Sequence, residues 1–581
     1  MTLKISELLN AYRNRTLTPR GTIQKLLKKI EEAPSEIWIS KTSPEQLEKY
    51  LQRLESKNPG TLPLYGIPFA VKDNIDLECL PTTAACPDFS YKPTRSAFVV
   101  DRLIRFGAIP LGKTNMDQFA TGLVGTRTPY GAIPNKFAPD YISGGSSSGS
   151  AAALAYGLCS FSLGTDTAGS GRIPAAFNEL VGVKPTRGLL SAKGVVPACK
   201  SLDCVSIFAL DHSDARYLLN LAAAEDPEDA YSRAAPWNVG KKAERLSESW
   251  TFGVPDDSEL EFFGNENFRK SFYKAVETFE KAGGTKVSIS FAPFLEAARL
   301  LYEGPWVFER YDAVGKFIET HPESVHPVTK SIIAPKRTPH PSEVFAGFHT
   351  LQEKKKLADR ELSKVDFLLT PTAGTIYKTK EVEENPILFN SNLGYYTNYM
   401  NLLDYAALAI PAGRAQSSDA NVPGFPFGVT LVGKAFDDFK LLDAAEKVSP
   451  FFEAKIAFAV CGAHLKGEPL HEELSNAEFL GSGKTAAEYN MIALLDGKIP
   501  KPALFAGGKS AFYVELYAMS AADFGKFVAK IPVPLGMGKV KLSNGEILPG
   551  FIGDASIAKC GNSENVKDIS AFGDWRKFIH S

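Results

Sequence analysis

The sequence has little cysteine, no excess of either charge and no long apolar run. Its 581 residues include seven cysteines and no CxxC pair, which argues against a disulfide framework or structural zinc and favours a reducing compartment. Lys plus Arg number 65 and Asp plus Glu number 66, so no nucleic-acid-binding surface is expected. No stretch approaches the roughly 18 apolar residues of a membrane span, and the N-terminus lacks the apolar core of a signal peptide. We therefore expect a cytoplasmic protein that acts on a small molecule and contacts neither membrane nor nucleic acid.

Apolar residues are nevertheless abundant, at 44% of the chain, and the length is enough for several domains of about 100 to 200 residues each. Up to about residue 60 they recur at helical spacing, for example at Ile5, Leu8, Leu9 and Tyr12. This spacing predicts amphipathic helices that serve as scaffold or as the surface of a homodimer.

Beyond residue 60, short apolar runs alternate with helical segments. The sequence predicts strands within 66–73, 107–113, 205–210, 365–373 and 425–433, and helices within 97–106, 399–408 and 437–453. This alternation is typical of an α/β domain with a mixed or parallel sheet. We place that domain at residues 1–453, and a smaller α+β domain with an Asn-Gly hairpin signal at residues 454–581.

The stretch from residue 143 to residue 172 is unusually rich in serine and glycine. SGGSSSGS runs directly into the helix-forming AAALA, and GTDTAGSGR follows after that helix. Small residues let consecutive backbone N–H groups point at one spot, which is how an oxyanion hole is built. A flexible linker is the alternative interpretation, but the apolar AAALA and SFSLGT segments disfavour it.

A serine nucleophile in this stretch needs a base. None of the eight histidines stands in a recognisable triad context, and the G-x-S-x-G match at 145–149 does not follow an apolar strand, so an α/β-hydrolase is disfavoured. Lys72, in the apolar segment IPFAVKDN, can serve if burial lowers its pKa toward neutrality. Taken alone, Lys72 is more typical of a lysine at a strand end whose amine reaches solvent.

Four segments together resemble the amidase signature family: VKDN at 71–74, GGSSSGSAAA at 144–153, GTDTAGSGRIPAAF at 164–177 and GVKPTRG at 182–188. The resemblance implies a mixed central β-sheet flanked by helices, and amide hydrolysis by a Ser-cisSer-Lys triad without a metal or organic cofactor. It implies that Ser170 is the nucleophile, that Ser146 is the bridging serine with a cis peptide bond, and that Lys72 is the base.

The same resemblance implies an oxyanion hole made by the backbone N–H groups of Thr167, Ala168, Gly169 and Ser170. Ser148 stands where the family more usually has glycine. That departure leaves the three triad positions untouched.

Within the family, MDQFATGLVGTRTPYG at 116–131 and LYEGPWVFERY at 301–311 resemble the allophanate hydrolase branch, which acts in urea degradation. This implies that Tyr302, Arg310 and Gly122 bind the small substrate. The planar fork of arginine suits a carboxylate. Gly304 and Pro305 are expected to interrupt the helix between Tyr302 and Arg310.

The presence of a C-terminal domain also resembles that branch, which implies that the domain assists decarboxylation of N-carboxycarbamate with His464 as its base. The implied partners are a second copy of the chain, in a homodimer, and a urea carboxylase, fused or separate. Another small-amide amidase and an amidotransferase component that hydrolyses glutamine remain alternatives. A binding module without activity is disfavoured because Lys72, Ser146 and Ser170 are all present.

Overall fold

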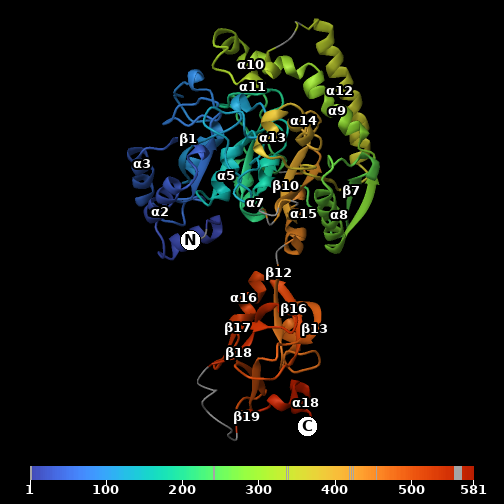
Figure 1. The fold of residues 1–581 in the computed structure, drawn as a ribbon. Helices are drawn as coiled ribbons and strands as arrows, with labels where there is room; N and C mark the ends of the chain where they lie inside the picture. The colour runs from blue at the N-terminus through green and yellow to red at the C-terminus, as the bar shows by residue number, and fades with distance from the viewer. Residues whose placement is uncertain are drawn as a thin grey trace. The chain divides into compact units, whose positions relative to one another are not determined.

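The chain divides into two compact units, Met1–Phe452 and Glu453–Ser581, which are described separately (Figure 1). The computed structural model describes residues 3–239, 243–334, 337, 339–417, 419, 422, 424–452, 455–554 and 565–581. Residues 453 and 454, at which we placed the predicted domain boundary, lie outside the described residues. Among the described residues, no helix is both long and apolar enough to cross a bilayer.

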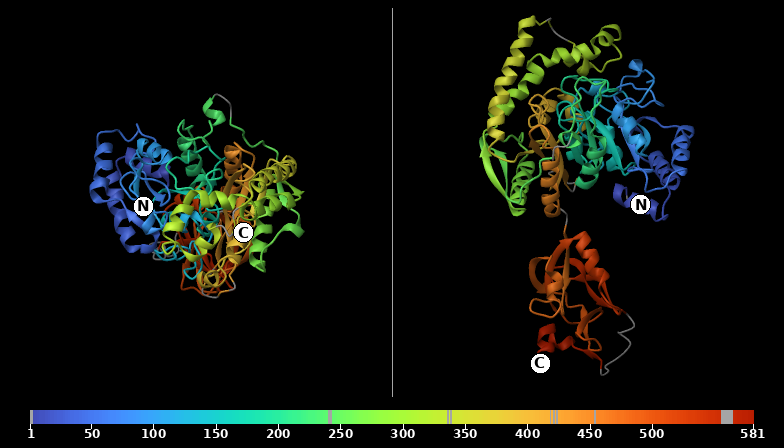
Figure 2. Two further views of the ribbon diagram at one scale, coloured as in Figure 1. Left: turned by 90° about the horizontal axis from the view of Figure 1, so that it is seen from above. Right: turned by 180° about the vertical axis from the view of Figure 1, so that it is seen from behind.

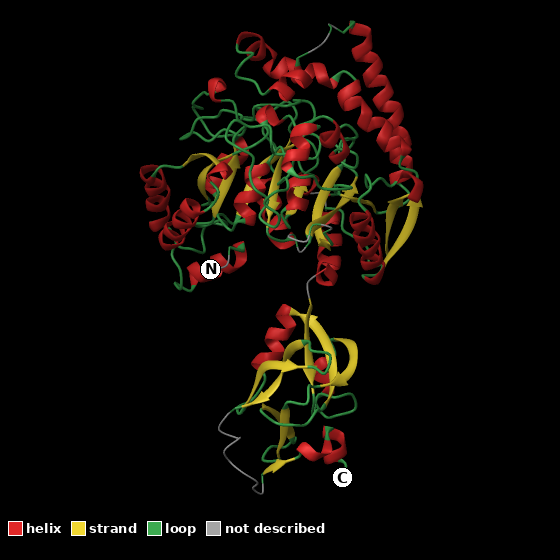
Figure 3. Ribbon diagram, viewed as in Figure 1, coloured by secondary structure: helices red, strands yellow, loops and turns green. Residues whose placement is uncertain are grey.

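The larger unit is built on an eleven-stranded sheet with the strand order β1-β3-β2-β4-β6-β5-β10-β11-β9-β7-β8 (Figure 3). The strands are β1 (Trp38–Lys41), β2 (Pro68–Lys72), β3 (Ile109–Thr114), β4 (Phe161–Asp166), β5 (Val181–Lys184), β6 (Cys204–Ala209), β7 (Trp250–Pro255), β8 (Gly284–Ile289), β9 (Phe367–Pro371), β10 (Ala406–Ala415) and β11 (Phe425–Gly433). β2 is parallel to both β3 and β4, whereas β10 and β11 are antiparallel. The predicted α/β fold with a mixed sheet is therefore confirmed.

The sheet's central strands are buried along their whole length, as in β2, β4 and β6. Buried strands read as continuous apolar runs, which is why the sequence revealed them. One prediction was wrong: residues 399–408 form turns and then the start of β10 instead of a helix. The small residues of AALA fit between β5 and β11, and this tertiary pairing overrides the helical propensity of alanine.

Helices and loops cover the sheet of this unit. They are α1 (Ile5–Arg13), α2 (Pro19–Glu32), α3 (Pro44–Glu55), α4 (Phe98–Arg105), α5 (Ser148–Ala155), α6 (Ile173–Phe177), α7 (His212–Ala222), α8 (Glu266–Lys281), α9 (Ala292–Glu303), α10 (Trp306–Thr320), α11 (Pro327–Ile333), α12 (Pro341–Leu362), α13 (Thr379–Glu384), α14 (Leu388–Leu393) and α15 (Asp438–Phe452). Helices α9 to α12 gather in one group, visible from the front and from behind (Figures 1 and 2). That group covers the substrate side of the site described below.

The N-terminal helices do not offer the apolar surface that the homodimer interpretation requires. Ile5, Leu8, Leu9 and Tyr12 on α1 are all buried within the chain itself. Asp211 caps α7, and the α7 carboxylate Asp214 accepts a hydrogen bond from the Ile5 backbone N–H at 3.1 Å. The apolar face of α1 is therefore scaffold, and the spacing of these residues gives no support to a dimer.

The smaller unit contains a second sheet with the strand order β13-β16-β12-β18-β15-β14-β19, in which β17 also pairs with β18. Its strands are β12 (Lys455–Val460), β13 (Glu478–Lys484), β14 (Tyr489–Leu494), β15 (Lys501–Ala506), β16 (Tyr513–Ser520), β17 (Leu535–Lys541), β18 (Ile547–Gly553) and β19 (Val566–Asp568), with helices α16 (Ala521–Ala529) and α18 (Trp575–Ile579). The predicted Asn-Gly hairpin joins β17 to β18, and Gly545 has the positive φ of +89° that such a turn requires.

Candidate active site

The three predicted triad residues come from segments that meet at one edge of the larger sheet. Lys72 is the last residue of β2, and Ser170 lies in the turn between β4 and α6. β2 and β4 are parallel neighbours, so their carboxyl ends lie side by side. Ser146 precedes α5, and its peptide bond with Gly145 is cis, as expected.

A continuous chain of hydrogen bonds joins the three side chains. The Lys72 amine donates to Ser146 Oγ at 2.7 Å, and Ser146 Oγ lies 3.0 Å from Ser170 Oγ. Thr165 Oγ1 accepts a second bond from the Lys72 amine, also at 2.7 Å. Lys72 and Ser146 are fully buried and Ser170 is 3% exposed. The arrangement can carry a proton from one serine through the other to the amine.

Burial lowers the pKa of Lys72 to about 7, although the nearby carboxylates of Asp117, Asp166 and Asp203 oppose the shift. An ammonium that loses its water shell is disfavoured against the neutral amine. A substantial fraction of Lys72 is therefore neutral at physiological pH, and a neutral amine has a lone pair that can accept a proton.

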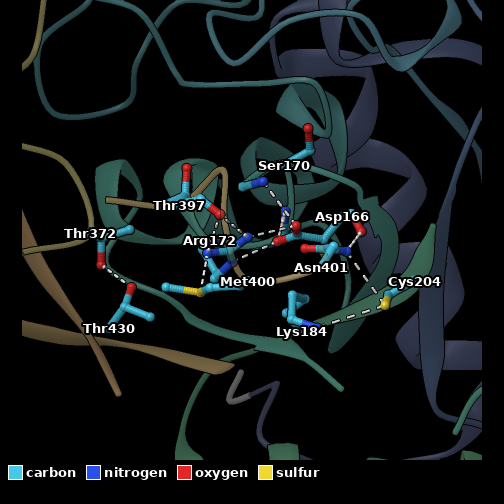
Figure 4. A network of polar contacts seen from close by, with 12 residues as sticks. Asp166, Ser170, Arg172, Lys184, Cys204, Thr372, Thr397, Met400, Asn401 and Thr430 are labelled. Atoms are coloured by element: carbon cyan, nitrogen blue, oxygen red, sulfur yellow. Dashed lines mark hydrogen bonds and ion pairs between the residues drawn. The ribbon is translucent and has the colours of Figure 1, made fainter. Parts of the chain in front are cut away.

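The turn that carries Ser170 is held from below by a buried ion pair (Figure 4). Asp166 Oδ2 accepts from Arg172 Nε at 2.8 Å, and both side chains are fully buried. Asp166 also accepts the backbone N–H groups of Gly169 at 2.9 Å and Gly171 at 3.0 Å. Burial raises the pKa of Asp166, but the charge of Arg172 and these hydrogen bonds outweigh it and lower the pKa. Figure 4 shows Ser170 Oγ pointing away from this network.

This brace corrects one predicted oxyanion donor. The Gly169 N–H donates to Asp166, so it shapes the turn instead of facing a substrate. Within the described residues, the N–H groups of Thr167, Ala168 and Ser170 have no backbone acceptor. They are the donors that stay available. At Gly169, φ is +137° and a Cβ would stand 2.5 Å from Thr397 Oγ1, so this position requires glycine.

Gly122 lies against the nucleophile, as the resemblance implied for a substrate contact: Ser170 Oγ donates to the Gly122 carbonyl at 3.4 Å. The flanking residues are fixed from two sides. Arg127 Nη1 donates to the Thr121 carbonyl at 2.9 Å, and the Leu123 N–H donates to Asn390 Oδ1 at 2.8 Å. The backbone of Gly122 therefore forms a rigid wall of the site.

Asp117 holds the neighbouring loops together. Its carboxylate accepts the N–H groups of Gly125 and Arg127, at 2.9 Å each. A Cβ at Gly145 would stand 2.1 Å from Asp117 Oδ2, so only glycine fits before Ser146. Sequence analysis did not identify Asp117, Asp166 or Thr165 as site residues, although all three stand inside the motifs that carry the resemblance.

Tyr302 and Arg310 come together across a break between two helices. Tyr302 stands near the end of α9, Arg310 belongs to α10, and Gly304 and Pro305 separate the helices as predicted. The guanidinium carbon of Arg310 lies 5.3 Å from the centre of the Tyr302 ring. Tyr302 also lines a cavity of about 750 Å³ together with Arg127 and Asn390.

Arg310 is a buried cation that lacks an anionic partner. It is 2% exposed, and its Nε and Nη1 atoms have no hydrogen-bond acceptor among the described residues. Asp203 senses its charge: burial raises the pKa of Asp203 to about 6, and Arg310 is one of the groups that limit the rise. Asp203 in turn accepts the Thr167 hydroxyl, which connects Arg310 to the nucleophile turn. Asp203 was not identified from the sequence, because it stands 33 residues beyond Ser170.

His464 lies four residues after β12 in the smaller unit, where it lines a cavity of about 330 Å³. Its Nε2 atom lies 3.2 Å from Glu473 Oε2. Burial lowers the pKa of His464, while Glu473 acts in the opposite direction. The predicted base therefore stands in a cavity beside a carboxylate that can orient its ring.

Two family descriptions match the chain. "Amidase" covers residues 21–442, and "Allophanate hydrolase C-terminal domain" covers residues 456–580. The chain belongs to the amidase family. The amidase match includes Lys72, Ser146 and Ser170, and the second match includes His464.

Several relatives share both parts of the chain. Urea amidolyase of Saccharomyces cerevisiae is 42% identical over 598 residues, which are 96% of this chain and 32% of that protein. The chain thus spans about a third of the length of the curated urea amidolyases that it matches. A solved Kluyveromyces lactis allophanate hydrolase is 40% identical with a TM-score of 0.71, and the match covers 99% of both chains.

Other members of the amidase family match the larger unit. The solved glutamyl-tRNA(Gln) amidotransferase amidase chain of Thermotoga maritima is 26% identical with a TM-score of 0.63, and the match covers 77% of this chain and 94% of that one.

Proposed function

We propose that this amidase is an allophanate hydrolase that acts in urea degradation and releases ammonia and carbon dioxide. The hydrogen-bonded Lys72, Ser146 and Ser170 side chains are the observation that carries the amidase part of this proposal. The similarity to an allophanate hydrolase over both units supports the substrate. No step of the reaction calls for a metal or an organic cofactor.

In the first step, neutral Lys72 takes the Ser170 proton by way of Ser146. Ser170 Oγ attacks the ureido carbonyl carbon of allophanate, and the oxygen of that carbonyl becomes negative. Backbone N–H groups of Thr167, Ala168 and Ser170 stabilise it, and one such donor contributes about 2.7 to 4 kcal/mol. The C–N bond to the terminal amino group then breaks, and the proton returns along the same path to the departing ammonia.

Water next attacks the acyl-enzyme, with the same relay accepting its proton. This releases N-carboxycarbamate and restores the Ser170 hydroxyl. Because both half-reactions use one proton path, the fully buried position of Lys72 excludes bulk water from the base throughout.

The substrate carboxylate is recognised by Arg310 in this proposal, with the Tyr302 ring beside it. A buried guanidinium without an anionic partner is costly. A bound carboxylate supplies the missing partner through charge-assisted hydrogen bonds. Gly122 completes the pocket on the side of the nucleophile.

The smaller unit accelerates loss of carbon dioxide from N-carboxycarbamate. His464 delivers a proton to the nitrogen while Glu473 orients its ring. Carbamate results, and it decays to a second ammonia and carbon dioxide. A urea carboxylase, fused or separate, supplies allophanate, the protein acts in the cytoplasm, and the homodimer remains our expectation.

An ammonia-release assay tests this function. We expect turnover of allophanate to exceed turnover of malonamate and glutamine. A preference for glutamine would instead place the chain among the glutamine-hydrolysing components of amidotransferases, and no turnover of any small amide would indicate a binding module.

A further inference from the structure

The cavity of the smaller unit carries more charge than its proposed proton donor needs. Its volume is about 330 Å³, and its lining includes His464, Glu473, Lys501, Lys530 and two phenylalanines, Phe527 and Phe551. These residues come from the turn after β12, the start of β15, the end of α16 and β18. Widely separated segments thus build one small polar pocket with an aromatic wall.

The aromatic wall fixes the imidazole. The His464 ring stacks on Phe551 with 5.1 Å between the ring centres and 15° between the planes, and Phe527 meets it edge-on at 5.2 Å. Its Nε2 atom faces Glu473, and within the described part of the chain Nδ1 has no hydrogen-bond partner. One ring nitrogen is therefore oriented by a carboxylate while the other is available.

The two lysines are not neutralised. No described carboxylate lies within ion-pairing distance of the Lys501 or the Lys530 ammonium. Glu473 is the one acid among the lining residues, and it faces His464. With His464 neutral, the cavity carries two positive charges and one negative charge.

We infer that this cavity is a binding site for a small dianion with two carboxylates, in which Lys501 and Lys530 each hold one carboxylate beside His464. The inference rests on the proposed function and names the groups that recognise its intermediate. N-carboxycarbamate is such a dianion, because two carboxylates share one nitrogen. Its compact size fits the volume of the cavity.

The reaction balances with the groups present. The bond between nitrogen and one carboxyl carbon breaks, its electron pair stays on nitrogen, and carbon dioxide leaves. Protonated His464 transfers its proton to that nitrogen, which gives carbamate, and water then reprotonates the imidazole. The charged groups that face His464 are Glu473, Lys501, Lys530 and, when protonated, His471. A bound dianion offsets the lysines and favours the protonated imidazole that the step needs.

Replacement of each lysine by methionine tests the site in the full-length chain. Lys501→Met and Lys530→Met keep the apolar stem and remove the charge. Lys526→Met is the matched control, because Lys526 stands on the same helix but pairs with Asp523 outside the cavity. We measure the ratio of carbon dioxide release to first ammonia release with ¹³C-labelled allophanate.

We expect the ratio to fall about tenfold or more in each cavity variant, since a charge-assisted contact is lost, and to stay unchanged in the control. Arginine at either position should restore most of it. An unchanged ratio in both methionine variants, with a lowered ratio in His464→Ala, overturns the dianion site and leaves the proposed function standing.

Malonate provides an arm that does not depend on allophanate turnover. It has the two carboxylates of the intermediate with carbon in place of nitrogen. We expect malonate to raise the pKa of His464, followed by ¹⁵N NMR of labelled histidine, in the wild-type chain and not in the Lys501→Met/Lys530→Met double variant. An equal response in both proteins overturns the inference. If malonate responds as expected but allophanate releases no ammonia, the proposed function fails and the dianion site stands.

Discussion

The two cavities differ in how their charges are used. Around Ser170, the carboxylates of Asp117 and Asp166 each accept two backbone N–H groups and so fix the loops that face the substrate. In the smaller unit, Lys501 and Lys530 face the cavity without such partners. Covalent catalysis needs a nucleophile placed to within a fraction of an ångström, whereas loss of carbon dioxide needs charge and a proton. The difference indicates rigid chemistry in one unit and electrostatic recognition in the other.

The largest expected effect belongs to the nucleophile. Ser170→Ala should lower ammonia release from allophanate by about 10⁴-fold or more, because no other group can form the acyl-enzyme. Ser148→Ala is the matched control: Ser148 lies in the same loop as Ser146, and its buried Oγ has no partner to lose among the described residues. Comparable rates for the two variants would refute the role of Ser170.

Lys72→Met should cost about 10²- to 10⁴-fold in kcat, the usual contribution of a general base. The pH profile sharpens this test. Because only the neutral amine accepts a proton and the pKa of Lys72 is about 7, the wild-type rate should fall toward acid pH and level off above neutrality. A rate that is constant from pH 5 to pH 8 would exclude Lys72 as the base.

Arg310→Ala should weaken kcat/KM for allophanate by about 10- to 100-fold, the value of a charge-assisted pair. Turnover of an uncharged amide, which never makes that pair, should change much less. Arg337 is the control, since it lines the cavity that Tyr302 also lines but pairs with Glu343. Equal losses on both substrates would give Arg310 a structural role.

The smallest effect tests the separation of the two units. A chain that ends at Phe452 should release the first ammonia within about twofold of the full-length rate, because the sheet and helices of the larger unit form a core of their own. The same chain, like full-length His464→Ala, should accumulate N-carboxycarbamate, seen by ¹³C NMR. Carbon dioxide release as fast as in the full-length protein would deny the smaller unit a catalytic part.

The contacts around the nucleophile were predictable to the extent that they are local. Lys72, Ser146 and Ser170 stand in short motifs whose backbone path is set by small residues, so the sequence pattern predicts their meeting. The Gly169 N–H was misassigned because its direction depends on the Asp166 carboxylate, which in turn depends on Arg172. Such a dependence is not visible in a motif.

Non-local structure was harder to predict. β7 and β8 were missed in a region that reads as helical, because their partner β9 lies more than a hundred residues from β7 along the chain. Lys501 and Lys530 carry no motif at all. They become a site only when β15 and the end of α16 are brought to the same cavity.

The unpaired Arg310 also determines how the protein behaves on the bench. Any small carboxylate or phosphate that reaches the guanidinium binds the folded chain and not the unfolded one, so it raises the melting temperature by mass action. The apparent stability will therefore depend on the buffer anion, and a thermal-shift screen of small acids will report occupancy of the amidase pocket. Kinetic constants measured in acetate or phosphate will include competition from the buffer itself.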